Sequence, residues 1–243
     1  MEMKYGYIAK ILYFRELLRQ IKRLYRWDYI SSRTGIAPST LSRYLHGRII
    51  PNPDRVDNLI NLLETLLNIE ELIRDSLMID KYGYLNNQKI ITDIGFLKFI
   101  ALKTSWRYQG KLDLVLSPAT DGVPYATLVA EYLGTPMVIA KDRKEVGVHK
   151  HLEASVISDD GSVRTLYVAK GPLKKGYRVL IVDDVIRTGE THRGLIELIK
   201  KAGAIPLGIH VIIAIGSKWR YLEDKYNIPI DAVVRLGERL RQG

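Results

Sequence analysis

Residues 179–191 constrain the fold of this chain more than any other segment, and they read Val-Leu-Ile-Val-Asp-Asp-Val-Ile-Arg-Thr-Gly-Glu-Thr. Four apolar residues come directly before Asp183 and Asp184, which predicts a buried parallel strand that ends at two carboxylates. Apolar residues then recur at helical spacing over 195–199, so a helix is expected next. Backbone N–H groups at a helix start favour a phosphate, and paired carboxylates suit ribose hydroxyls or a hydrated Mg²⁺. The segment therefore predicts a pocket for a phosphorylated sugar.

An earlier loop favours the same kind of site. A strand is expected over 112–116, and the loop Ser117-Pro118-Ala119-Thr120-Asp121-Gly122 follows it. Residues 123–133 are predicted to form a helix that ends at Gly134, because glycine suits the position after a helix. Such a loop is by itself a common connection between a strand and a helix. Together with the 179–191 segment, it indicates a second phosphate-binding loop.

The C-terminal part of the chain alternates strands and helices, which predicts an α/β fold with a doubly wound parallel sheet. The expected elements are 112–116, 123–133, 136–141, 178–182, 191–202 and 205–215. Both predicted phosphate loops follow strands, and sites in such folds lie at the carboxyl ends of the strands. Between residues 141 and 170 the alternation stops. A hairpin is expected there, with strands at 155–158 and 163–168 around a polar turn at 159–162.

The first fifth of the chain is strongly basic. The net charge is +10, and residues 1–50 contain ten basic but only three acidic residues. This asymmetry favours a polyanionic partner, although a solvated basic helix face would carry the same charge. Helices are expected at 8–25, 29–33 and 38–45, and the last two are joined by a turn at Gly35. That arrangement predicts a helix-turn-helix unit. The alternative is a small helical bundle that serves only dimerisation.

Length and composition suit two modules. We expect a helix-turn-helix domain over 1–79, a linker over 80–89 and an α/β domain over 90–243, within a chain of 243 residues. The chain has no cysteine, which excludes disulfides and thiolate metal sites. It has no apolar stretch long enough to span a membrane and no signal-peptide pattern. A cytoplasmic, nucleoid-associated protein without a membrane partner is therefore expected.

The 179–191 segment resembles the phosphoribosyl-pyrophosphate (PRPP) signature of type I phosphoribosyltransferases. The resemblance implies that Asp183 and Asp184 face the ribose hydroxyls, and that Mg²⁺ binds with PRPP at these two acids. It assigns the 5′-phosphate to Arg187, Thr188, Gly189, Glu190 and Thr191. It assigns the pyrophosphate to Ala119, Thr120, Asp121 and Gly122, together with Lys141 and Arg143. The charged segment 141–145 is equally consistent with a solvated edge.

Two further resemblances concern the hairpin and the N-terminal helices. In type I phosphoribosyltransferases the hairpin region is a mobile flap over the active site. Its outline here resembles the xanthine-phosphoribosyltransferase branch, which includes the bacterial purine repressor. Residues 35–42 resemble the Cro and phage-repressor type of helix-turn-helix, although Ala37 replaces the usual polar cap. This likeness implies that double-stranded DNA contacts Pro38, Ser39, Thr40, Ser42, Arg43, His46 and Arg48.

The combination of a helix-turn-helix with a phosphoribosyltransferase-like domain resembles the archaeal GfcR-type transcription regulators. The resemblance implies a DNA-binding regulator that senses PRPP or a related phosphorylated metabolite and acts as a homodimer or homotetramer. The alternative is an active phosphoribosyltransferase that transfers ribose 5-phosphate from PRPP to a purine or pyrimidine base. Such an enzyme needs a cover over the base, and 216–220 with Trp219 is the candidate segment. A tryptophan at such a position more often packs a helix against the sheet, and no catalytic residue is assigned.

Overall fold

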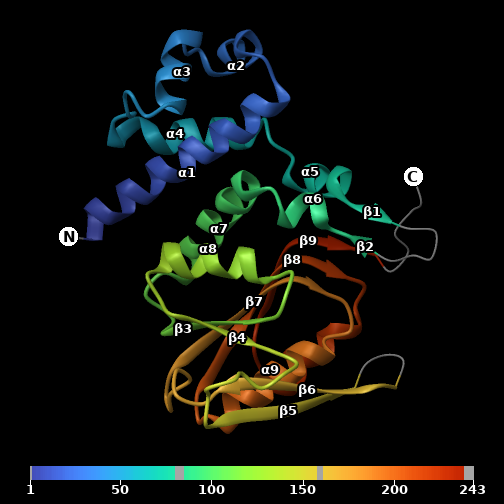
Figure 1. The fold of residues 1–243 in the computed structure, drawn as a ribbon. Helices are drawn as coiled ribbons and strands as arrows, with labels where there is room; N and C mark the ends of the chain where they lie inside the picture. Colours follow the sequence, from blue (N-terminus) through green and yellow to red (C-terminus); the bar gives the residue numbers. More distant parts are fainter. Residues whose placement is uncertain (1, 80–84, 158–160, 238–243) are drawn as a thin grey trace.

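The N-terminal part of the protein is helical. The computed structural model describes residues 2–79, 85–157 and 161–237, and Figure 1 shows their arrangement. Five helices come first: α1 (Glu2–Leu24), α2 (Trp27–Thr34), α3 (Pro38–Leu45), α4 (Pro53–Glu64) and α5 (Ile69–Ser76). The long helix α1 packs against α3 and α4 and also against a helix of the second part of the chain. Among the described residues, no helix is both long and apolar enough to cross a membrane.

The segment expected to be a linker contains regular structure. Strands β1 (Met78–Ile79) and β2 (Leu85–Asn86) pair antiparallel, and the short helix α6 (Gln88–Ile91) follows. Residues 80–84 of the expected linker lie outside the described residues. Ile90 and Ile91 are buried, so apolar packing holds α6 in place. The residues around these two isoleucines are polar, which made the segment look like a linker in the sequence. Helix α7 (Ile94–Tyr108) follows after a break at Thr92 and Asp93.

The second part is an α/β unit, as predicted. Its five-stranded sheet has the order β4-β3-β7-β8-β9, and every pair in it is parallel. The strands are β3 (Leu114–Pro118), β4 (Met137–Ala140), β7 (Arg178–Ile186), β8 (Ile205–Ile215) and β9 (Ile230–Leu236). Helices α7 and α8 (Val123–Leu133) lie on one face, and α9 (Glu190–Lys201) lies on the other (Figure 1). The fold positions both predicted phosphate loops at the carboxyl ends of the neighbouring parallel strands β3 and β7.

Some details differ from the prediction. Strand β7 continues beyond the two acids to Ile186, because Val185 and Ile186 pair with Ile213 and Ala214 of β8. The edge strand β9 was not predicted, and neither were the short helices η1 (Lys218–Arg220) and α10 (Tyr221–Tyr226) that precede it. The hairpin is longer than predicted: β5 (His151–Ile157) and β6 (Val163–Ala169) pair in antiparallel register. Residues 158–160 of its turn lie outside the described residues.

One hydrophobic cluster joins the helical part to the sheet. It contains Tyr13 and Phe14 of α1, Phe99 of α7 and Leu180 of β7, all fully buried. The rings of Tyr13 and Phe99 stack with their centroids 5.4 Å apart. The Tyr13 hydroxyl donates to Glu64 Oε1 of α4 at 2.5 Å, and Lys103 Nζ of α7 donates to the same oxygen at 3.0 Å. The two parts of the chain therefore share a core and are held together by apolar and polar contacts.

A buried histidine in β8 makes stability depend on pH. His210 Nε2 lies 3.0 Å from Thr104 Oγ1, and burial lowers the pKa of His210 to about 4. In the unfolded chain the same imidazole takes up a proton near pH 6.5. The unfolded state therefore binds more protons between pH 6.5 and 4, so acidification through this window destabilises the folded protein.

We expect the free energy of unfolding of the native chain to fall more between pH 7 and pH 5 than that of His210→Gln. Glutamine does not titrate and can still hydrogen-bond Thr104, so the difference between the two losses isolates the histidine. It should amount to about 2 kcal/mol. Urea unfolding followed by circular dichroism at both pH values measures it. Equal losses in the two proteins would contradict the assignment.

Candidate functional site

The two acids of the 179–191 segment lie near the carboxyl end of the central strand β7. Asp183 is only 6% exposed, and its Oδ1 accepts a hydrogen bond from the backbone N–H of Asp184 at 2.9 Å. Asp184 is half-buried. Burial raises the pKa of Asp183 to about 6. Burial and then the neighbouring Asp183 charge raise the pKa of Asp184 to about 7. Burial thus disfavours the charged form of the pair, and the hydrogen bonds that the pair receives offset the burial only in part.

This arrangement fits hydroxyl donors and a hydrated cation. Hydrogen bonds from ribose hydroxyls, or a bound Mg²⁺, would stabilise the charged form of the two carboxylates, which burial disfavours. Within the described part of the chain, no group of three or more histidine, aspartate or glutamate side chains is arranged to hold a metal ion. A Mg²⁺ ion at Asp183 and Asp184 would therefore take its other ligands from water and from a bound phosphate compound, as Mg²⁺ commonly does.

The predicted 5′-phosphate loop lies at the N-terminus of α9. Gly189 is the N-cap and has a φ of 88°, a conformation that favours glycine. A Cβ atom there would lie 2.8 Å from Leu222 Cδ1 and 3.3 Å from Trp219, so η1 and α10 pack closely against the loop. Arg187 is exposed, and Thr188 and Thr191 are half-buried. The backbone N–H groups of a helix start and two hydroxyls are thus available to an anion.

Glu190 contributes to this loop in a different way from the threonines. Its carboxylate accepts hydrogen bonds from Arg193 Nε at 2.8 Å and from the Tyr221 hydroxyl at 2.7 Å. Although burial works against it, these two bonds hold the pKa of Glu190 below its usual range. A charged carboxylate repels a phosphate, so any part of Glu190 in phosphate binding comes from its backbone N–H.

Trp219 packs beneath the phosphate loop. It is 1% exposed, and its indole Nε1 donates to the carbonyl oxygen of Gly216 at 3.1 Å. A ring that is already covered offers no face to a stacked base. Of the two interpretations of this tryptophan, the structure therefore supports packing, and segment 216–220 supports Gly189 from the side of the core.

The predicted pyrophosphate loop lies against the acid pair. The backbone N–H of Ala119 donates to the carbonyl oxygen of Ala140 at 2.8 Å, and the Ala119–Thr120 peptide bond is cis. Thr120 and Asp121 are exposed. Gly122 is buried so closely that an added Cβ would lie 2.9 Å from Asp183 Cα and 3.0 Å from the Asp184 nitrogen. The structure thus brings the two predicted loops together into one site.

Lys141 and Arg143 follow the neighbouring strand β4. Lys141 exchanges backbone hydrogen bonds with Tyr167 of β6, at 2.9 Å and 2.7 Å, and its ammonium group pairs with Glu145. Arg143 is exposed. Because Ala140 pairs with Pro118 in the sheet, Lys141 begins beside the pyrophosphate loop. Its charge is already paired, so a ligand would have to compete with Glu145.

Three residues at this site were missed in the sequence. Arg164 of β6 donates from its guanidinium to Thr191 Oγ1, so the hairpin reaches the phosphate loop. The buried His192 has its Nε2 3.2 Å from Asp183 Oδ2, and burial lowers its pKa to about 4, which leaves it neutral. Asn87, from the segment taken as a linker, donates from its amide to Asp184 Oδ2. Only His192, next to the motif, was within reach of sequence reasoning.

The second candidate site is on the helical part. Ile30 of α2 and Leu41 of α3 are buried between the helices, and Gly35 has a φ of 68° at the turn. The predicted DNA-contact residues all lie on or just after α3, and each is exposed or half-buried: Pro38, Ser39, Thr40, Ser42, Arg43, His46 and Arg48. Arg43 and Arg48 form no ion pair with any residue that the structure describes. Their charges therefore stay available to a polyanion.

Comparison with known proteins defines the family of the second part. The model of the phosphoribosyl transferase domain matches residues 83–233. The chain belongs to this family. The matched residues include both predicted phosphate loops and the acid pair.

Relatives of two kinds share this domain. The chain is 32% identical over 119 residues to the purine biosynthesis transcriptional repressor PurR of Bacillus subtilis. This match covers 49% of this chain and 42% of PurR. The chain thus spans less than half the length of that relative. It is 31% identical over 154 residues to xanthine phosphoribosyltransferase 1 of Clostridium perfringens, covering 60% of this chain and 78% of the enzyme.

Solved structures agree on the fold of this domain. The adenine phosphoribosyltransferase of Trypanosoma brucei, in complex with AMP, pyrophosphate and ribose-5-phosphate, superposes with a TM-score of 0.62 and 16% identity. The match covers 70% of this chain and 79% of that protein. At this identity the likeness concerns the fold alone.

Proposed function

We propose that this protein is a DNA-binding transcription regulator whose phosphoribosyl transferase domain senses PRPP or a related phosphorylated metabolite. The observation that carries the proposal is the presence in one chain of a helix α3 that exposes Arg43 and of an acid pair beside two predicted phosphate loops. The PurR relatives, one a repressor and one an activator of purine biosynthesis by their names, support it. In this proposal the helix-turn-helix domain is 1–79, the connection is 80–89 and the sensing domain is 90–243.

The proposed ligand contacts follow the geometry of the site. Asp183 and Asp184 would bind the ribose hydroxyls and, when PRPP carries it, Mg²⁺. The loop 187–191 would bind the 5′-phosphate, and the loop 119–122, with Lys141 and Arg143, would bind pyrophosphate. A resident Mg²⁺ would supply positive charge between the acids and the phosphates.

Binding to DNA should require at least two copies of the chain. One helix-turn-helix reads only a half-site, and dimers of such proteins place their recognition helices about 34 Å apart. We therefore propose a homodimer or homotetramer. DNA from upstream of the protein's own gene is the first probe, and fluorescence anisotropy at several salt concentrations tests the binding.

Two arginine variants test the DNA interface. Arg43→Ala should cost roughly 1–3 kcal/mol on the preferred sequence and relax specificity at one base position. Arg48→Ala should weaken binding to all sequences alike and lower the slope of log affinity against log salt by about one. The control is Lys98→Ala, an exposed cation on α7 outside the helix-turn-helix. If both arginine variants bind DNA like the native chain, the placement of DNA on α3 is wrong.

The second candidate function is phosphoribosyl transfer from PRPP to a nucleobase. The juxtaposed loops and the xanthine phosphoribosyltransferase relatives favour it. Catalysis of this kind rests on positioning and on charge stabilisation, which the acid pair and loops can supply. Incubation with PRPP, Mg²⁺ and each purine or pyrimidine base, followed by chromatography for nucleotide, tests it. Turnover without salt-sensitive DNA binding would decide for the enzyme.

A further inference from the structure

The connection between the two parts of the chain touches the acid pair directly. The Asn87 amide donates to Asp184 Oδ2, although the two residues are far apart in the sequence. Asn87 is 7% exposed, and its carbonyl oxygen accepts the N–H groups of Ile90 at 2.8 Å and of Ile91 at 3.1 Å. Asn87 thus starts helix α6 with its backbone and binds the acid pair with its side chain. A shift of this side chain would move the first turn of α6.

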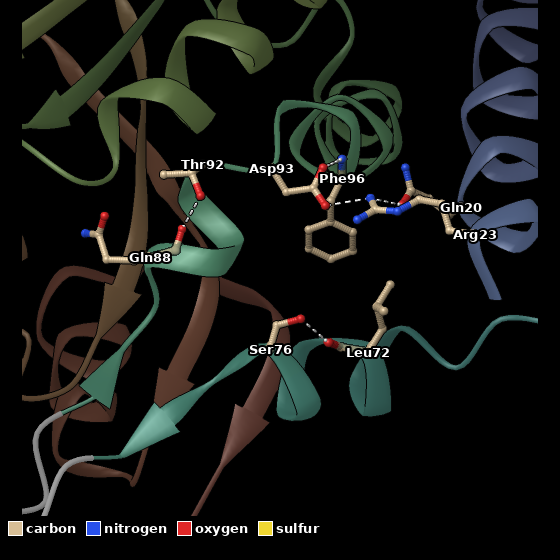
Figure 2. A network of polar contacts seen from close by, with 8 residues as sticks. All are labelled: Gln20, Arg23, Leu72, Ser76, Gln88, Thr92, Asp93 and Phe96. Atoms are coloured by element: carbon tan, nitrogen blue, oxygen red, sulfur yellow. Dashed lines mark hydrogen bonds and ion pairs between the residues drawn. The ribbon is translucent and has the colours of Figure 1, made fainter.

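The other end of α6 is tied to the helical part. Asp93, two residues after the end of α6, caps α7 by accepting the N–H of Phe96 at 3.0 Å, and it pairs with Arg23 Nη1 at 2.5 Å (Figure 2). Arg23 lies in the last turn of α1 and also donates to Gln20 Oε1 at 3.1 Å. Helix α2 of the helix-turn-helix begins only a few residues later, at Trp27. The short segment 87–93 therefore connects the acid pair to the end of α1, just before the helix-turn-helix begins.

Space for movement exists beside this segment. A cavity of about 220 Å³ lies between α1, α5, α6 and α7, and its lining includes Arg23, Leu72, Ile90, Asp93 and Phe96. Figure 2 shows α6 with its internal bond from Thr92 Oγ1 to the Gln88 carbonyl oxygen, which lies 2.6 Å away. Because protein interiors are otherwise close-packed, a cavity on one side lets a short helix shift without opening the main core.

We propose that Asn87 is a positioning residue that couples occupancy of the acid pair to the helix-turn-helix, through α6 and the Asp93–Arg23 ion pair. The inference rests on the proposed function, in which PRPP binds at Asp183 and Asp184. A ribose hydroxyl or cation at Asp184 competes for the oxygen that Asn87 now binds, so the Asn87 amide must turn and α6 follows. The Asp93–Arg23 pair transmits this shift to the end of α1.

The test is a binding cycle on the full chain. The affinity for PRPP with Mg²⁺ is measured with and without DNA from upstream of the gene, and the DNA affinity with and without PRPP and Mg²⁺. In the native chain the two ratios must agree by linkage, and a factor between about 5 and 150 is typical. In Asn87→Ala and in Asp93→Asn the factor should fall to about one. Asparagine at 93 still caps α7, so this variant removes the ion pair alone.

A matched control and a second readout separate coupling from stability. Asn52→Ala also changes an N-cap asparagine, but Asn52 is exposed, makes no side-chain cap bond and should leave the factor unchanged. Hydrogen exchange of the amides in 88–93 and 20–25 should change when PRPP and Mg²⁺ bind the native chain, but not in 20–25 of Asp93→Asn.

The outcomes are distinct. A native factor of one overturns the proposed sensing, and this inference with it. A native factor well above one that is unchanged in both variants overturns the role of Asn87 alone, while the proposed function stands. A native chain that binds no PRPP or no DNA overturns the proposed function and this inference with it.

Discussion

Replacing Asp183 and Asp184 together by asparagine should lower PRPP affinity more than a hundredfold, about 2.7 kcal/mol. Each carboxylate would lose a charge-assisted hydrogen bond to a ribose hydroxyl, and a bound Mg²⁺ would lose both protein ligands. Calorimetric titration with PRPP, in the presence and absence of Mg²⁺, measures the change. The double variant Asp54→Asn with Asp75→Asn removes the same charge from exposed positions and should bind like the native chain.

The variant with asparagine at both 183 and 184 should be no less stable than the native protein. Asp183 is buried, and burying a charge without a partner costs stability, whereas asparagine keeps the hydrogen-bonding shape. Loss of PRPP binding together with an unchanged or raised melting temperature would show that the acids serve a ligand. Native affinity in the variant would sink the assignment of this site.

Gly122→Ala should abolish measurable PRPP binding, although it adds only a methyl group. That methyl would collide with Asp183 Oδ1 and lie 2.9 Å from Asp183 Cα and 3.0 Å from the Asp184 nitrogen. Two of these atoms are backbone atoms of the central strand, so the loop itself must move. Overpacking of this kind costs roughly 1–3 kcal/mol of stability, and it separates the loop from the acid pair.

The comparison variant for this glycine is Gly171→Ala. Gly171 has ordinary φ and nothing within 4 Å of an added Cβ, so its replacement should leave PRPP affinity and melting temperature as they are. Differential scanning fluorimetry and the same titration measure both variants. If Gly122→Ala binds PRPP with native affinity, the two loops do not act as one site.

The sequence predicted the sheet and its loops because local signals coincide there. The apolar runs before Asp183 and within 205–215 have the length of buried strands, and Gly134 marks the end of α8. The position of Pro38 likewise fixed the start of α3. Such features depend on neighbours along the chain, so one sequence suffices to recognise them.

The sequence did not predict contacts between distant segments. Asn87 and Arg164 carry no motif, and each reaches the site only because the fold brings another element beside it. The predicted end of β7 was also wrong. The two acids suggested that the strand stops there, but pairing with β8 extends it to Ile186. Trp219 was open between two roles until its burial was known.

The shared core beneath α1 bears on how such a protein can diversify. A protein whose reader and sensor are joined only by a tether can exchange either part by recombination. Here Tyr13 of α1 stacks on Phe99 of α7, and both rings belong to one buried cluster. A foreign DNA reader grafted at residue 80 would leave that apolar surface of α7 bare and prone to aggregation. On the proposed function, new DNA specificities should therefore arise through substitutions on the outer face of α3, with α1 retained.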